Sequence, residues 1–172
     1  MLIFTCLLSA ALADKPENPS LDGVYIYVPS KDDAQMVNKQ LEKSLAEMNP
    51  VFRHFARSRL QRGAAIDSKI ELKMKNQKVT LIHYNQLEKA VLTVPINKKV
   101  RSQQESGLTH KVDYTSHQLN RMDRTSQGGR SVVYKLSKDG KTLLVKFQFF
   151  SKYIPKPVKY TLKYVKNLVD KP

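Results

Sequence analysis

Residues 131–149 read SVVYKLSKDGKTLLVKFQF, and this stretch decides the fold. An Asp-Gly pair at residues 139–140 separates two runs in which every second residue is apolar. The runs are Val132, Tyr134 and Leu136 before the pair, and Leu143, Val145, Phe147 and Phe149 after it. Asp-Gly between two alternating runs is a strong signal for a β-hairpin. We therefore expect antiparallel strands with one apolar face.

The same period of two continues through most of the chain after Gly63. Further alternating sets are Ile70, Leu72 and Met74; Val79, Leu81 and His83; Ala90, Leu92 and Val94; and Tyr160, Leu162 and Tyr164. Two weaker strands are predicted near residues 109–115 and 118–125, and residues 21–28 (LDGVYIYV) predict a first strand. Connections this short exclude parallel crossovers, and a long meander with one apolar face closes best into a barrel. The predicted fold is mainly β, an antiparallel up-and-down barrel of 8–10 strands.

An α-helical pair is predicted after the first strand, over about residues 32–62. Ser30 or Asp32 is a candidate cap, and apolar residues then recur at helical spacing until Pro50 begins a second helix. The apolar stripe of the second helix consists of Phe52, Phe55, Ala56 and Leu60. We expect the pair to lie across one end of the barrel.

This order of elements resembles the calycin superfamily, and the fatty-acid-binding proteins more than the classical lipocalins. Leu21-Asp22-Gly23-Val24-Tyr25 stands where those families carry F-x-G-x-W or G-x-W, and Asp139-Gly140-Lys141 matches their late hairpin. The resemblance implies a lipocalin or fatty-acid-binding-like barrel, of a bacterial exported type, that binds an apolar or amphipathic ligand. The family often has R-x-Y on its last strand, where this chain has Leu162 and Tyr164.

Residues 1–13 are predicted to be a cleavable signal peptide. Residues 2–12 carry no charge and end in an A-x-A pattern at Ala11-Leu12-Ala13, before a polar extended leader at 14–20. An apolar core this short is typical of export signals, whereas a buried N-terminal strand is the alternative. The only cysteine, Cys6, lies in this segment. We therefore expect residues 21–172 to form one disulfide-free domain that is periplasmic or secreted.

The chain is strongly basic, with 30 Lys and Arg against 15 Asp and Glu, a formal charge of +15. Such a surplus attracts polyanions. Outside the cytoplasm these are anionic lipids and envelope polymers, so we expect no nucleic-acid partner. Arg53, Arg57 and Arg62 on the second helix are predicted to face an anionic membrane surface; an ordinary solvated basic surface is the alternative.

Arg59 is the candidate residue for binding the polar end of a ligand, because it projects within the apolar stripe of the second helix. A guanidinium facing a core needs an anion or another partner. It is predicted to hold a carboxylate or phosphate at the barrel mouth; pairing with an acidic residue of the chain, or extension to solvent along its aliphatic stem, is the alternative. The other predicted ligand-binding residues face inward on strands: Tyr25, His83, Tyr134, Tyr160 and Tyr164.

No motif indicates catalysis. The mature chain has no G-x-S-x-G, no glycine-rich phosphate loop and no H-E-x-x-H, and His110 and His117 are expected at the surface. We therefore predict a monomeric, non-enzymatic carrier or sensor without metal or cofactor. The alternative is a basic envelope-interaction protein with a filled barrel that binds anionic lipid or polymer through its surface.

Overall fold

The computed structural model of this protein describes residues 20–86, 88–102, 107–115 and 117–167. The predicted signal peptide and Cys6 lie outside the described residues. Within them the chain forms one sheet of ten strands and two helices. In chain order these are β1 (Gly23–Tyr27), α1 (Asp33–Ala46), α2 (Pro50–Gly63), β2 (Lys69–Lys75), β3 (Lys78–Tyr84), β4 (Lys89–Pro95), β5 (Lys99–Arg101), β6 (Thr109–Thr115), β7 (Gln118–Arg124), β8 (Gly128–Leu136), β9 (Thr142–Ser151) and β10 (Val158–Lys166).

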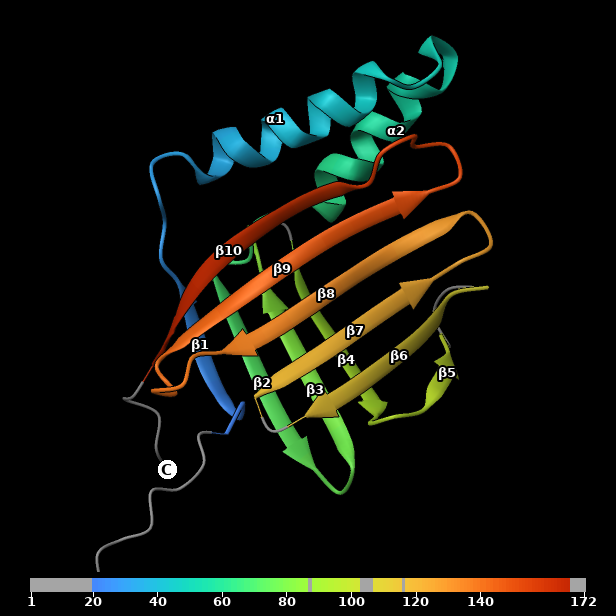
Figure 1. Ribbon diagram of the computed structural model, residues 1–172. Coiled ribbons are helices and arrows are strands. Elements are labelled where there is room, and N and C mark those ends of the chain that lie inside the picture. The colour runs from blue at the N-terminus through green and yellow to red at the C-terminus, as the bar shows by residue number, and fades with distance from the viewer. Residues whose placement is uncertain (1–19, 87, 103–106, 116, 168–172) are drawn as a thin grey trace, which may run out of the picture.

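The ten strands form an antiparallel up-and-down meander that curls into a near-closed barrel (Figure 1). The order in the sheet is β4-β3-β2-β1-β10-β9-β8-β7-β6-β5, so β1 joins the two halves by pairing with β10 on one side and β2 on the other. Within the described residues β4 and β5 are the two ends of the sheet and lie beside each other without a ladder between them. We call this line the β4–β5 seam.

The predicted fold class is confirmed, including the helical pair after the first strand. One strand was not expected. Lys99–Arg101, which is β5, contains a single apolar residue, Val100, and three residues are too few to show an alternation. This strand exists because β6 supplies the hydrogen-bonding edge on which it pairs, with Val100 opposite His110.

Alternating side chains of the strands fill the interior. On β9 and β10 the buried residues are those at every second position: Leu143, Val145, Phe147, Phe149, Val158, Tyr160, Leu162 and Tyr164. The cross-strand register places Leu162 opposite Val145 and Tyr164 opposite Leu143. One face of the sheet therefore forms a continuous hydrophobic core.

The helical pair covers one end of the barrel (Figure 1). Helix α1 buries Val37, Leu41 and Leu45 and packs against β10. The Ser44 hydroxyl donates to the carbonyl of Lys156, in the turn before β10, at 3.2 Å. Helix α2 begins as the sequence predicts, with Pro50 in its first turn and Asn49 Oδ1 accepting from the backbone N–H of Val51 at 3.0 Å. No helix among the described residues has the length and apolar character to cross a membrane.

The predicted stripe of α2 is only partly in the core. Leu60 is buried, but Phe52 and Phe55 have 51% and 72% of their surface exposed. The expectation that all four stripe residues face the core was wrong for these two. Only the C-terminal half of α2 reaches the barrel interior. Phe52 and Phe55, in its N-terminal half, therefore lie beyond the part of the helix that the barrel covers.

Candidate functional site

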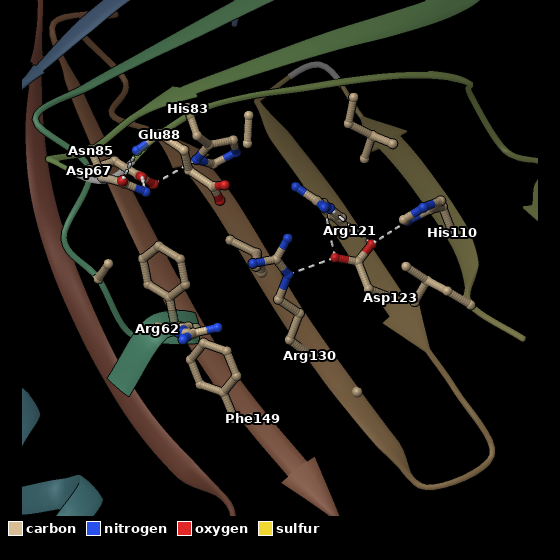
Figure 2. A pocket seen from close by; sticks show the side chains of 18 of the residues that line it. Arg62, Asp67, His83, Asn85, Glu88, His110, Arg121, Asp123, Arg130 and Phe149 are labelled. Carbon is tan, nitrogen blue, oxygen red and sulfur yellow. Dashed lines mark hydrogen bonds and ion pairs between the residues drawn. The ribbon is translucent and has the colours of Figure 1, made fainter. Parts of the chain in front are cut away.

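A cavity of about 650 Å³ lies inside the barrel beneath the C-terminal end of α2 (Figure 2). Its volume falls in the range of small-molecule sites. The apolar part of its wall includes Leu92, Leu108, Val132, Phe147 and Phe149. Its charged and polar part includes Arg59, Arg62, Asp67, His83, Asn85, Glu88, His110, Arg121, Asp123 and Arg130.

Asp123 is the centre of the first polar cluster, which we call the Asp123 cluster (Figure 2). Its Oδ1 accepts from Arg121 Nε at 2.9 Å and from His110 Nδ1 at 2.7 Å. Its Oδ2 accepts from Arg130 Nε at 2.6 Å and lies 2.8 Å from Arg121 Nη2 in an ion pair. A carboxylate has about four lone-pair sites, so these three hydrogen bonds and the ion pair occupy most of the accepting capacity of Asp123.

The sheet register brings these residues together. Asp123 on β7 lies directly opposite His110 on β6 and Arg130 on β8, and Arg121 is two residues along β7 on the same face. Both Arg121 and Asp123 are 5% exposed. Burial alone would raise the pKa of the Asp123 carboxyl, but Arg121 and Arg130 outweigh it and lower that pKa to about 2.

Asp67 and His83 form the second polar cluster, on the opposite wall (Figure 2). Asp67 Oδ2 lies 2.6 Å from His83 Nδ1, and His83 Nε2 lies 3.0 Å from the Tyr134 hydroxyl. A carboxylate only accepts, so His83 Nδ1 donates to Asp67, and Nε2 shares a hydrogen bond with the Tyr134 hydroxyl. Asn85 Nδ2 also donates to Asp67 Oδ1, at 3.4 Å.

Tyr134 connects the two clusters. Its fully buried side chain has its pKa raised to about 12 by burial, even though Arg121 and Arg130 act to lower it. In turn, burial acts to lower the pKa of Arg121, but the Tyr134 hydroxyl and the Asp123 carboxylate raise it above its usual value. A continuous polar chain therefore crosses the interior from Asp67 to Asp123.

Two more tyrosines leave polar atoms unsatisfied in the core. The hydroxyls of Tyr160 and Tyr164 are buried without a hydrogen-bond partner in the described structure. Burial raises the pKa of both, and Asp67 adds to the increase. Buried polar groups normally have a partner, so such orphaned hydroxyls are sites where a water or a ligand group is needed.

The predicted ligand-binding residues fall into three groups. Arg59 and His83 line the cavity, although Arg59 is exposed and not turned into the core as expected. Tyr134, Tyr160 and Tyr164 lie in the interior around the polar chain without lining the cavity. Tyr25 is fully buried elsewhere, and its hydroxyl donates to the carbonyl of Leu21 at 2.9 Å, a structural bond.

The three arginines predicted to face a membrane differ in their contacts. Arg53 Nη2 donates to the carbonyls of Ala46 and Met48 at 3.0 and 3.1 Å, which caps the end of α1. Arg57 forms a two-bond ion pair with Glu42 of α1, one bond being 2.8 Å. Among the described residues, the side chains of Arg62 and Arg59 have no hydrogen-bond or ion-pair partner, and both line the cavity.

Sequence reasoning missed the residues at the centre of the site. His110 was expected at the surface but is 8% exposed and bound to Asp123. Arg121, Asp123 and Arg130 were not singled out, and neither was Asp67. The available signal was the alternation itself, because Leu119, Arg121 and Asp123 share one face of β7. Two charged residues at inward positions obscure that signal, since they make the inward face as polar as the outward one.

A second hollow lies outside the barrel, between α2 and the β9–β10 turn. This apolar groove has a volume of about 330 Å³, and Phe52 stacks on Tyr153 across it with ring centres 5.7 Å apart. The groove is lined by Met48, Phe52, Phe55, Ala56, Arg59, Leu60, Phe149, Phe150, Tyr153 and Ile154. Arg59 belongs to both the groove and the cavity.

The described residues contain no group of three or more His, Cys, Asp and Glu side chains placed to hold a metal ion. The arrangement can instead supply hydrogen bonds and charge to a polar group, together with an apolar wall. These are the requirements for binding an amphipathic molecule.

No family model and no curated protein matches the sequence. Solved structures do match the fold. Apo lipid binding protein 8 of Caenorhabditis elegans has a TM-score of 0.54 and 15% identity, covering 85% of this chain and 94% of that one. The REP1-NXSQ fatty acid transporter has a TM-score of 0.53 and 13% identity, covering 86% and 96%. Fatty-acid-binding protein 1 of Echinococcus granulosus has 0.52 and 7%, covering 85% and 96%. The chain therefore has the calycin fold of the fatty-acid-binding type.

Proposed function

We propose that this protein, a barrel of the fatty-acid-binding type, is a non-enzymatic carrier or sensor that binds a small amphipathic ligand in its interior. The observation that carries the proposal is the cavity of about 650 Å³, whose wall joins aromatic and aliphatic side chains to two polar clusters. The similar structures named as lipid-binding or fatty-acid-binding proteins support the same function. The alternative assumed a filled barrel, and this cavity argues against it.

The polar end of the ligand has unpaired cations available to it. Arg59 and Arg62 line the cavity without an ion-pair partner among the described residues, and Arg130 uses only Nε on Asp123 in the contacts shown. A guanidinium binds carboxylate and phosphate groups well because its N–H groups form a planar fork. The predicted export signal is the basis for placing this activity in the periplasm or outside the cell.

The test is ligand retention in paired variants of β8. Val132 lines the cavity, whereas its neighbour Val133 is on the opposite face of the strand. In a displacement assay, oleate competes with a bound fluorescent fatty acid. We expect Val132→Phe to weaken oleate binding at least tenfold in this assay, and Val133→Phe to leave it unchanged. Native mass spectrometry of the wild-type protein from its own host should show a bound small molecule. Absence of both the bound molecule and oleate binding would reject the carrier function.

We further infer that the apolar groove and its neighbours dock on an anionic membrane, where the ligand is collected or delivered. Val51, Phe52 and Phe55 of α2 and Tyr153 expose apolar side chains, and the unpaired Arg59 lines the same groove. Arg62, which lines the cavity, follows about one turn later on α2. Arg53 and Arg57 contribute less, because they are occupied within the helical pair. Apolar insertion combined with basic side chains gives reversible attachment to anionic lipid.

Vesicle sedimentation tests this docking. Phe52→Ser combined with Phe55→Ser should reduce binding to phosphatidylglycerol vesicles at least fivefold, since both side chains are largely exposed. The matched control is Leu144→Ser combined with Ile26→Ser on the outer face of the barrel, where apolar side chains are also exposed. Equal binding by both double variants would count against the groove as the docking surface.

A further inference from the structure

The cavity carries charges of both signs, unlike the strongly basic chain around it. Its lining includes four arginines and three carboxylates, whereas the whole chain has a formal charge of +15. One of those carboxylates, Asp123, already pairs with Arg121 and with the Nε of Arg130. A ligand anion at this position would therefore share an arginine with a resident carboxylate.

Arg130 remains the available donor of the Asp123 cluster. Its Nε donates to Asp123, and its side chain is 37% exposed. Because Arg130 lines the cavity, its two Nη groups remain for a ligand. Arg121 is different, because its side chain is 6% exposed and contacts both oxygens of Asp123, Oδ1 by a hydrogen bond and Oδ2 by an ion pair. An anionic group of a ligand is therefore expected beside Arg130.

The opposite wall offers an acceptor. Asp67 is held by His83 and, over a longer contact of 3.4 Å, by Asn85, so Oδ1 retains accepting capacity. It is 6% exposed, and its hydrogen-bond partners are His83 and Asn85. A buried carboxylate with remaining lone pairs is best satisfied by an N–H or O–H group.

We propose that the cavity selects amphipathic acids that carry a hydrogen-bond donor next to the acid, such as N-acyl amino acids, over simple fatty acids. The acid pairs with Arg130, and the donor, an amide N–H in this class, binds Asp67 on the facing wall. The acyl chain lies along Leu92, Val132 and Phe147. This inference rests on the proposed carrier function and specifies its ligand class.

Three probes that share one acyl chain test the inference by calorimetry: oleate, N-oleoylglycine and N-oleoylsarcosine. The last has the same acid as N-oleoylglycine but a methyl group in place of the amide hydrogen. We expect N-oleoylglycine to bind at least tenfold more tightly than either of the others, because a site built around a buried acceptor discriminates against a ligand without the donor.

Variants then locate the discrimination. Asp67→Asn removes the charge but keeps the size, and should bring the three affinities within about threefold of one another. The control, Asp113→Asn, changes an exposed carboxylate paired with Lys111 on β6 and should retain the wild-type ranking. Equal affinities of the wild-type protein for N-oleoylglycine and N-oleoylsarcosine would overturn this inference and leave the carrier function intact. Failure of all three probes to bind would remove both.

Discussion

At the scale of single residues, Asp123 has a structural role that its position on a polar strand conceals. It accepts three N–H groups, one from each of the strands β6, β7 and β8, and neutralises one of the two arginine charges beside it. Removing one partner of a buried ion pair leaves the other charged and unpaired, which costs more than the pair contributes. The residue therefore holds β6, β7 and β8 together from inside.

Asp123→Ala should lower the free energy of unfolding by about 3–5 kcal/mol, because it leaves the buried Arg121 without its ion-pair partner. Asp113→Ala is the control, since that carboxylate is exposed and its pair with Lys111 is worth under about 1 kcal/mol. Urea unfolding measures both. Equal losses in the two variants would show that the cluster contributes no more than a surface ion pair.

Acid should destabilise the fold through two carboxyls. The pKa of Asp123 is lowered from 3.8 to about 2, with the arginines overcoming burial, and hydrogen bonds from Lys69 and Tyr84 lower the pKa of Glu71 from 4.5 to about 2. Folded pKa values below the unfolded ones give stability that is present above the unfolded values and lost as pH falls toward about 2. Unfolding free energies measured between pH 6 and 2 should therefore fall steadily below about pH 4.5.

Asp123→Asn should make that pH profile flatter than the wild-type profile, because one of the two carboxyls no longer titrates. A variant profile parallel to the wild type would assign the acid sensitivity to other groups.

At the scale of elements, the helical pair shows what periodicity can and cannot predict. The spacing of Val37, Leu41 and Leu45 and the position of Pro50 were sufficient to place both helices to within a few residues. Periodicity identifies which side chains share a face, but it does not say how far the covering structure extends along that face. For this reason the exposure of Phe52 and Phe55 could not be predicted from the sequence.

The two helix starts provide a matched pair of caps. Asn49 accepts a backbone hydrogen bond at the start of α2, whereas Asp32 occupies the same position of α1 without a side-chain bond. Asn49→Ala should cost about 1 kcal/mol in unfolding free energy, and Asp32→Ala only a few tenths. Thermal unfolding followed by circular dichroism would compare them; a larger loss for Asp32→Ala would contradict this assignment.

At the scale of the whole molecule, charge is divided between inside and outside. The interior clusters are close to balanced, so almost all of the +15 surplus lies elsewhere on the chain. Like charges at this density repel one another and oppose the compact state. Added salt shortens the reach of that repulsion.

Raising sodium chloride from 10 to 200 mM should therefore increase the melting temperature by roughly 2–5 °C. Sodium sulfate at equal ionic strength is the control, because a larger effect of sulfate would indicate specific anion binding in place of screening. A melting temperature that falls with salt would mean that attractive ion pairs outweigh the net repulsion.

Most of the architecture could be predicted from the sequence, because alternation and short connections restrict ten strands to very few topologies. The candidate site was predicted less well. His83 and Tyr134 lie on strongly alternating strands and were identified, whereas Asp67 lies before β2 in a loop. The Asp123 cluster depends on register between three strands, and register is a long-range property that residue spacing along one strand does not encode.

The β4–β5 seam has a mechanical consequence for cargo size. Every other pair of neighbouring strands in the described sheet is joined by a backbone ladder, whereas no ladder joins β4 to β5. Ala90 and Leu92 of β4 line the cavity beside this line. The wall therefore deforms most easily at the seam, and the barrel can accommodate ligands of different width there. The polar clusters on the hydrogen-bonded strands keep their geometry.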